Sequence, residues 1–182
     1  MKEIKTFESE NIGSLKLNEL DYKYGGALTT KLDELKSPFT QEIINEVVLW
    51  KVNRYVNLDD TTLELLNKVG EKDFDDTKLL EKLLNTDGIR LPMASTILRF
   101  KNPDIYQIID QRAYRFLTGA EFKESSIAKK QIELYREYLE KLIEVCEANK
   151  ILFRDSDRIF YLKDIELNSK VPLKESKIKS KI

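Results

Sequence analysis

Residues 86–116 read TDGIRLPMASTILRFKNPDIYQIIDQRAYRF, and this stretch decides the fold. It opens on a tight Gly-containing turn and continues into a short helical pattern. A Pro-containing loop at 101–104 then leads to a second helical segment. One acid in that segment, Asp110, lies in an otherwise apolar run, where a carboxylate is costly to bury unless it is paired or hydrogen-bonded. We therefore look here first for specialised chemistry.

Two short helices flank the Gly-containing turn. We expect them at Thr77–Leu84 and Leu91–Phe100. Pro92 suits the first turn of the second helix, where a missing N–H costs nothing. The free N–H groups of that turn would form a natural anion site for a backbone phosphate. Ala94 and Ser95 are small, which permits close approach of the paired helix or of a strand of nucleic acid.

Amphipathic helix patterns fill most of the remaining chain. Apolar residues recur at three- and four-residue spacing in 40–56, with Thr40 as the expected N-cap, and in 123–150. We expect Asp60 to cap a further helix and Ser156 to begin the last one. Gly and Pro are few, while Leu, Ile, Lys and Glu are abundant. The sequence therefore predicts an all-α, compact multi-helix domain.

The chain is expected to form one helical domain over residues 1–168. A helix-hairpin-helix element would span about 77–100, and the acid-bearing segment would span 103–117. A chain of 182 residues buries enough apolar surface to fold without a metal or a disulfide. Residues 169–182 are basic, and we expect a flexible tail, because frayed tails are commoner than functional arms on phosphates.

Histidine is absent and only one cysteine, Cys146, is present. These facts exclude Ser/His/Asp and Cys/His nucleophilic schemes, His-ligated metals, an internal disulfide and an iron–sulfur cluster. Cys146 falls on an apolar helix stripe, which indicates a small buried side chain. Acid–base work would fall to Asp, Glu, Lys or Tyr, or to a metal held only by oxygens. We expect no cofactor and no metal.

The net charge and the hydropathy exclude fewer classes of protein than the histidine and cysteine counts do. The net charge of −1 is not that of a typical nucleic-acid binder, but the placement of charge matters more than its total. No apolar run approaches the ~20 residues that span a bilayer, and the N-terminal residues lack the apolar core of a secretory signal. We therefore expect a cytoplasmic protein without membrane association. The oligomeric state stays open.

Asp110 has two compatible interpretations. It can cap a helix over Gln111–Leu117, with the preceding apolar residues packed beneath it. It can also act as a general base, since a capping acid at the mouth of a cleft remains available for chemistry. Arg112 lies two residues further on and would favour the ionised carboxylate.

Residues 88–98 (GIRLPMASTIL), the Pro-containing loop and residues 109–113 (IDQRA) resemble the helix-hairpin-helix–GPD superfamily of DNA glycosylases. The pattern of that family is a G-V-G-x-K-x-A hairpin, a Gly/Pro-rich loop and a V-D-x-x-V segment with the essential acid. On this match Gly88 and Ala94 take hairpin positions, and Asp110 takes the position of the catalytic acid. The match is confined to this region, and the flanking helices extend it only loosely.

Two departures from the family pattern affect the expected chemistry. Arg90 stands where the second hairpin Gly is expected, so the turn presents its N–H groups differently. Pro92 stands where bifunctional members carry the lysine that forms a Schiff base, so a lyase step through that position is not available. The resemblance therefore implies a monofunctional enzyme, in which Asp110 stabilises the positive charge on the sugar or activates water.

The resemblance also implies a DNA-binding surface and a pocket for a base flipped out of the duplex. The expected nucleic-acid-binding residues are Gly88, Arg90, Ala94, Ser95, Lys101 and Arg112. Lys51 and Arg54 are further candidate phosphate contacts, with solvated surface charges as the alternative. Trp50 and Tyr106 are candidates to stack on the base, with core packing as the alternative role of each.

Three hypotheses remain open at this point. The chain is a DNA N-glycosylase that uses Asp110, a non-catalytic module that binds duplex DNA, or a protein-interaction domain on the same helical scaffold. The altered hairpin and the near-neutral charge favour the second and third, whereas the retained acid favours the first. A resemblance of fold alone does not establish function.

Overall fold

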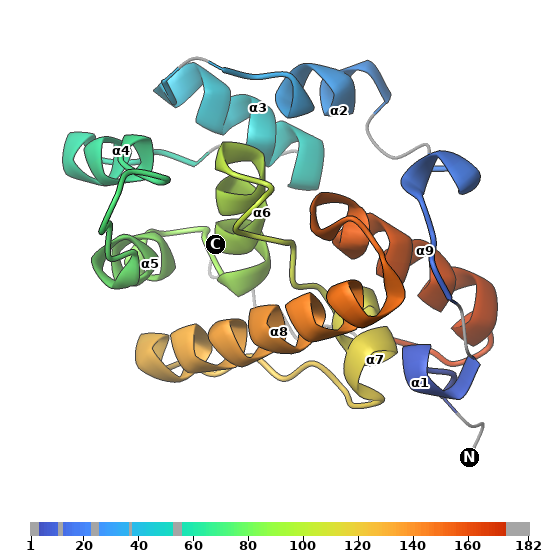
Figure 1. Cartoon of the computed structure of the whole chain (residues 1–182). Helices are drawn as coiled ribbons and strands as arrows, with labels where there is room; N and C mark the ends of the chain where they lie inside the picture. Colours follow the sequence, from blue (N-terminus) through green and yellow to red (C-terminus); the bar gives the residue numbers. More distant parts are fainter. Residues whose placement is uncertain (1–3, 11–12, 23–25, 37, 53–55, 174–182) are drawn as a thin grey trace.

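The computed structural model describes residues 4–10, 13–22, 26–36, 38–52 and 56–173 (Figure 1). All regular structure within these ranges is helical, which confirms the predicted all-α fold. The α-helices are α1 (Phe7–Glu10), α2 (Gly26–Asp33), α3 (Gln41–Val52), α4 (Asp60–Asn67), α5 (Thr77–Asn85), α6 (Leu91–Lys101), α7 (Gln111–Thr118), α8 (Ala128–Asn149) and α9 (Ser156–Asn168). Two 3₁₀ turns complete the order, η1 (Leu17–Glu19) and η2 (Phe153–Asp155).

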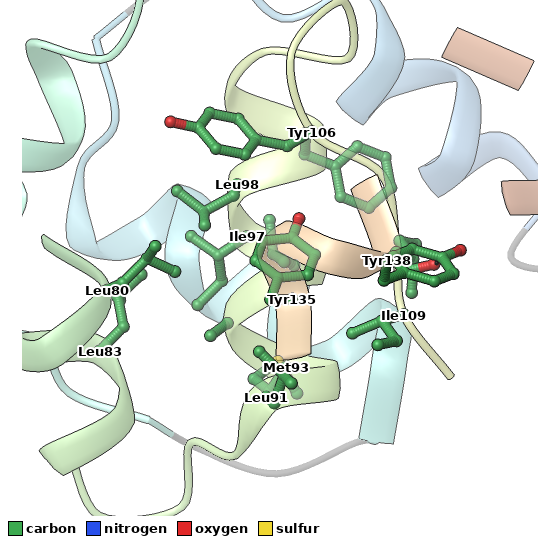
Figure 2. Close-up of a cluster of buried hydrophobic side chains, with 14 of the residues drawn as sticks. Leu80, Leu83, Leu91, Met93, Ile97, Leu98, Tyr106, Ile109, Tyr135 and Tyr138 are labelled. Carbon is green, nitrogen blue, oxygen red and sulfur yellow. Dashed lines mark hydrogen bonds between the residues drawn. The ribbon is translucent and has the colours of Figure 1, made fainter. Parts of the chain in front are cut away.

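Helix α6 is the centre of the fold. Every residue from Met93 to Phe100 is buried, which is the pattern of a helix surrounded by protein on all sides. Helices α3, α4 and α5 pack against it, and α8 crosses below it in Figure 1. Figure 2 shows leucines of α5, the apolar side chains of α6 and two tyrosines of α8 meeting in one core. The stretch that opened the sequence analysis therefore forms the middle of the molecule.

A second part of the core joins the ends of the chain. Helix α7 packs along α9, and α1 packs against α7. The ring of Phe160 stacks on Phe7 at 5.3 Å between centroids and meets the ring of Phe116 edge-on at 5.5 Å. These contacts hold α7, whose N-cap is Asp110, against α1 and α9.

The turn between α5 and α6 has the expected helices on both sides, each within one residue of its predicted end. Gly88 has φ +82°, a left-handed conformation that favours glycine. The N–H groups of Met93 and Ala94 both donate to the carbonyl of Arg90 at 2.9 Å, and Pro92 has no N–H. The first turn of α6 therefore offers fewer free N–H groups than the sequence suggested.

One local prediction is wrong. Asp59, rather than Asp60, is the N-cap of α4, and its side chain accepts a hydrogen bond from the Thr62 N–H at 2.6 Å. The helix expected behind Asp110 is present: Asp104 lies in a turn, residues 106–110 form neither helix nor strand, and α7 begins directly after Asp110.

The predicted tail begins immediately after α9. Within its described part, residues 169–173, the carbonyl of Val171 accepts a hydrogen bond from Arg115 at 3.1 Å. Residues 174–182 of that prediction, like Arg54, lie outside the described residues. Among the helices that the structure describes, none combines the length and the apolar character needed to cross a membrane.

Candidate functional site

The segment 106–110 lies in neither a helix nor a strand, and side chains from two other helices hold it. The hydroxyl of Tyr135 donates to the carbonyl of Gln107 at 2.8 Å, and the hydroxyl of Tyr138 donates to that of Ile108 at 2.9 Å. The N–H of Ile109 donates to Ser95 Oγ of α6 at 3.2 Å. These partners replace the hydrogen bonds that a helix would supply, and they lie in the core shown in Figure 2. The backbone that presents Asp110 is therefore fixed on both sides.

Asp110 is the N-cap of α7, and it uses only one oxygen for that role. Its Oδ1 accepts hydrogen bonds from the N–H groups of Arg112 at 2.8 Å and Ala113 at 2.9 Å. No residue that the structure describes donates to Oδ2. The capping interpretation is thus correct, and it leaves half of the carboxylate available.

Asp110 lines a pocket of about 220 Å³. This volume is below the range of about 300–1,000 Å³ typical of sites for drug-sized ligands, so the pocket suits one small ring system. Its other lining residues are Tyr22, Trp50, Lys51, Ile108, Asp157, Arg158 and Tyr161. Three of them are aromatic, and two are cationic. The combination of flat apolar walls, positive charge and a carboxylate is suited to an aromatic ring attached to an anionic backbone.

The wall formed by Trp50 is rigid. Its side chain is buried, its ring meets Phe100 edge-on at 5.0 Å between centroids, and its indole N–H donates to Thr29 Oγ1 at 2.7 Å. The Lys51 ammonium lies 5.9 Å from the centroid of the Trp50 ring. Trp50 therefore packs in the core, as one of its two interpretations predicts, and it also lines the pocket.

The opposite side of the pocket belongs to α9 and its ion pairs. Arg158 lies over the ring of Tyr22 at 5.0 Å and donates two hydrogen bonds to Asp33, at 2.8 and 2.9 Å. Arg99 of α6 also donates to Asp33. Burial acts to raise the pKa of Asp33, but the hydrogen bonds and positive charges of the two arginines outweigh it and hold that pKa below its usual value. The two guanidinium groups are thereby anchored from α2.

The side chain of Arg112 is directed to Asp164 and not to Asp110. Its guanidinium donates to Asp164 at 3.1 Å and lies 5.9 Å from the Tyr161 ring centroid. Only its backbone N–H reaches Asp110. The prediction that the Arg112 side chain pairs with Asp110 is therefore wrong, because a buried carboxylate on α9 binds it instead.

Three of the predicted contact residues are buried. Ala94 and Ser95 have no exposed surface, so their small size serves helix packing and, for Ser95, the bond to Ile109. Tyr106 is also buried and donates to Asp76 at 2.8 Å, and burial raises the pKa of its phenol well above the usual value. Tyr106 does not line the Asp110 pocket, which agrees with the core-packing alternative.

The remaining predicted contact residues lie at the two ends of α6. Gly88 and Arg90 are in the turn before it, where Arg90 is largely exposed and pairs with Glu124 at 3.1 Å. Lys101 is in the last turn, donates to Asn67 at 3.3 Å, and has a pKa lowered by burial. A helix of 11 residues is about 16 Å long, so Lys101 and Arg90 cannot hold the same phosphate.

Four polar or aromatic residues of the pocket were not predicted as site residues, namely Tyr22, Asp157, Arg158 and Tyr161. They come from the two ends of the chain, and no local pattern marks them. Asp157 and Arg158 carried the only available signal, as charged residues in the first turn of a predicted helix. Among the described residues, no cluster of three or more His, Cys, Asp or Glu side chains could hold a metal ion.

No family model matches this chain, and no curated protein or solved structure matches it either.

Proposed function

We propose that this chain is a divergent relative of the helix-hairpin-helix–GPD DNA glycosylases, and that it hydrolyses the N-glycosidic bond of a base in duplex DNA. The observation that carries this proposal is Asp110, which caps α7 through Oδ1 and keeps Oδ2 free of described donors at an aromatic-walled pocket. A fixed carboxylate beside a ring-sized pocket is what such a hydrolysis requires.

The mechanism begins with extrusion of the target base from the duplex, since the glycosidic bond is inaccessible within the stack. The base enters between Trp50 and Tyr161, and the sugar lies at Asp110. As the bond breaks, positive charge grows on the sugar and the Asp110 carboxylate stabilises it. The base leaves with the electron pair of the broken bond, water bonds to the sugar carbon and gives a proton to the carboxylate, and that proton then passes to the departed base. The enzyme is monofunctional, because Pro92 offers no amine at the position used for a Schiff base.

Duplex binding is assigned to the turn between α5 and α6, with Arg90 as its cation. Such contacts are to phosphates and do not depend on sequence. Arg90 must exchange Glu124 for a phosphate when DNA binds. Lys51, at the pocket, is positioned for the backbone next to the extruded base. Each phosphate contact releases counterions, so binding through these two cations is expected to weaken as the salt concentration rises, with a slope of roughly −2 in log affinity against log salt.

The decisive experiment measures base release from duplexes that each carry one alkylated, deaminated or oxidised base. Wild-type protein is expected to release at least one of them, and Asp110→Asn is expected to release none while keeping its circular dichroism spectrum. Salt-dependent duplex binding without release by either protein would establish a non-catalytic DNA-binding module. Absence of both binding and release would leave the protein-interaction hypothesis.

A further inference from the structure

A second and larger pocket, of about 650 Å³, lies beside the Asp110 pocket. Tyr22 and Arg158 line both pockets, so these two side chains form a wall that the pockets share. The larger volume falls within the range of about 300–1,000 Å³ that is typical of sites for small organic ligands. The proposed reaction leaves this second pocket unused.

Asp155 contributes an unpaired carboxylate to the second pocket. It is the N-cap of α9, but its side chain makes no capping hydrogen bond, unlike those of Asp59 and Asp110. Although Asp155 is partly buried, no described residue donates to its carboxylate. Burial raises the pKa of this carboxyl and outweighs the positive charges of nearby arginines. A partly buried acceptor that lacks a donor at a pocket points to a donor on a ligand.

The arginines around this carboxylate are held by other acids. Arg158 and Arg99 both donate to Asp33. Arg154 is directed to Asp104, at 3.7 Å. Arg158 and Asp33 also line the second pocket, where their opposite charges compensate each other. The carboxylate therefore keeps its negative charge without a direct ion pair among the described residues.

Lys16 lines the same pocket and supplies the opposite charge. It is exposed, and its ammonium forms no ion pair with Asp155 or with any other described residue. Leu17, Leu20 and Leu152 give the pocket an apolar surface. Leu152 is 59% exposed, more than any other large apolar side chain that the structure describes, so a ligand that covered it would remove apolar surface from water. The lining thus offers a cation, an anion and an apolar surface to one ligand.

We propose that the second pocket binds a small zwitterion with an apolar body, which is the chemistry of an apolar amino acid or of a dipeptide. Its ammonium group donates to Asp155, its carboxylate pairs with Lys16, and its apolar side chain covers Leu152. Charge-assisted hydrogen bonds are about twice as strong as neutral ones, so each charged end contributes to recognition. A molecule with only one charge would leave the other charge of the pocket unpaired. This inference does not depend on the proposed function, because it involves neither Asp110 nor a nucleic acid.

The measurement is calorimetric binding of L-leucine and of the dipeptide leucyl-leucine, each with two analogues that lack one charge. N-acetylation removes the ammonium group, and amidation removes the carboxylate. Wild-type protein should bind the better of the two zwitterions roughly tenfold or more tightly than either of its analogues, since hydrogen bonds to charged groups are the stronger class. Tighter binding of L-leucine would identify a free amino acid as the ligand, and tighter binding of leucyl-leucine would identify a peptide.

Two substitutions assign the charged ends of the ligand to their partners. Asp155→Asn should bind the zwitterion no better than its N-acetylated analogue, and Lys16→Gln should bind it no better than its amide. Asn is a good N-cap, so Asp155→Asn should keep the fold. The matched controls are Asp60→Asn and Lys36→Gln, which remove exposed charges of the same signs outside both pockets and should keep the wild-type affinities.

The outcomes separate this inference from the proposed function. Base release by a wild-type protein that binds neither zwitterion at millimolar concentration, or binds the analogues equally well, would overturn the inference alone. A preference for the zwitterion that survived both substitutions would place the ligand elsewhere and also overturn it. Zwitterion binding with the expected charge dependence, but without base release from any duplex, would support the inference and overturn the glycosylase. Because the wild-type comparison needs no variant, a folding failure of either variant leaves the test intact.

Discussion

Asp110 caps a helix with one carboxylate oxygen and lines a pocket as well. The two N–H groups at the start of α7 need an acceptor, and Oδ1 supplies it. A carboxylate has a second oxygen, and Asp110 presents it where Trp50 and Tyr161 line a pocket. The cap explains why the acid stands at this position in the chain. Under the proposed function, the pocket requires a carboxylate, which a neutral cap such as Ser or Asn does not supply.

The two roles of Asp110 can be separated by comparing two substitutions. Asn is as good an N-cap as Asp, so Asp110→Asn should keep the free energy of unfolding within about 0.5 kcal/mol, whereas Asp110→Ala should lower it by about 1 kcal/mol. Both variants should lose base release, since neither has a carboxylate. Urea denaturation measures the first effect, and single-turnover release measures the second.

A remote cap provides the control. Asp59→Ala removes the side chain that caps α4 through Thr62, yet Asp59 does not line the Asp110 pocket. This variant should lose stability and keep base release. If Asp110→Asn destabilised the protein as much as Asp110→Ala does, the cap geometry described for α7 would be incorrect.

At the scale of elements, residues 106–110 depend on α8. An extended segment has no hydrogen bonds of its own, and the hydroxyls of Tyr135 and Tyr138 satisfy two of its carbonyls. These tyrosines are completely or nearly completely buried, and burial raises the pKa of each phenol well above its usual value. They therefore remain neutral donors over the whole pH range in which the protein is studied.

Tyr138→Phe should weaken both the fold and the site. The carbonyl of Ile108 would lose its donor inside the core, at a cost of about 1–3 kcal/mol in the free energy of unfolding. The backbone before Asp110 would loosen, so the rate of base release should fall more than duplex binding does. Urea denaturation and single-turnover kinetics measure the two effects.

Tyr114→Phe is the matched control, because the Tyr114 hydroxyl donates to no described residue although its ring packs near that of Tyr138 at 6.3 Å between centroids. It should change stability and rate little. Equal effects of the two substitutions would show that ring packing, rather than the hydroxyl, holds the segment.

The same segment marks the limit of what the sequence could predict. Three- and four-residue spacing of apolar side chains located the helices, since that pattern is local. It also allowed a helix that begins at Gln111 behind the Asp110 cap, but it gave no account of the residues before that cap. The course of residues 106–110 depends on Tyr135 and Tyr138, which lie about thirty positions away in the chain. No local rule detects partners at that distance.

The candidate site likewise contains some residues that the sequence could indicate and others that only the fold brings together. Asp110, Trp50 and Lys51 could be selected from the sequence, by an acid in an apolar run and by residues beside a helix stripe. The rest of the pocket, including Tyr22 and Asp157, is assembled only when the ends of the chain meet α6 and α7. Charge partners were also unpredictable, since Arg112 binds an acid 52 positions later rather than its near neighbour.

At the scale of the molecule, α7 and α9 act as one unit that carries Asp110 on one helix and Asp157 on the other. Asp164 joins them from a fully buried position, where it accepts hydrogen bonds from Arg115 Nε at 2.8 Å and Nη2 at 2.7 Å, and from Arg112 at 3.1 Å. Removing one partner of a buried pair leaves the other charge uncompensated. The integrity of the pocket should therefore depend on a residue that does not line it.

Asp164→Asn should lower the free energy of unfolding by roughly 3 kcal/mol, because Arg115 would remain buried without a counterion. The melting temperature of a chain of this size should then fall by roughly 10 °C. The control is Glu166→Gln, which removes the exposed partner of the Lys163–Glu166 ion pair on the same helix. It should change the free energy of unfolding by less than about 1 kcal/mol.

Because both helices supply pocket residues, nucleoside binding and helical structure should be lost at the same urea concentration. Binding that disappears well before the helices unfold would show that α7 and α9 are not the single unit inferred here.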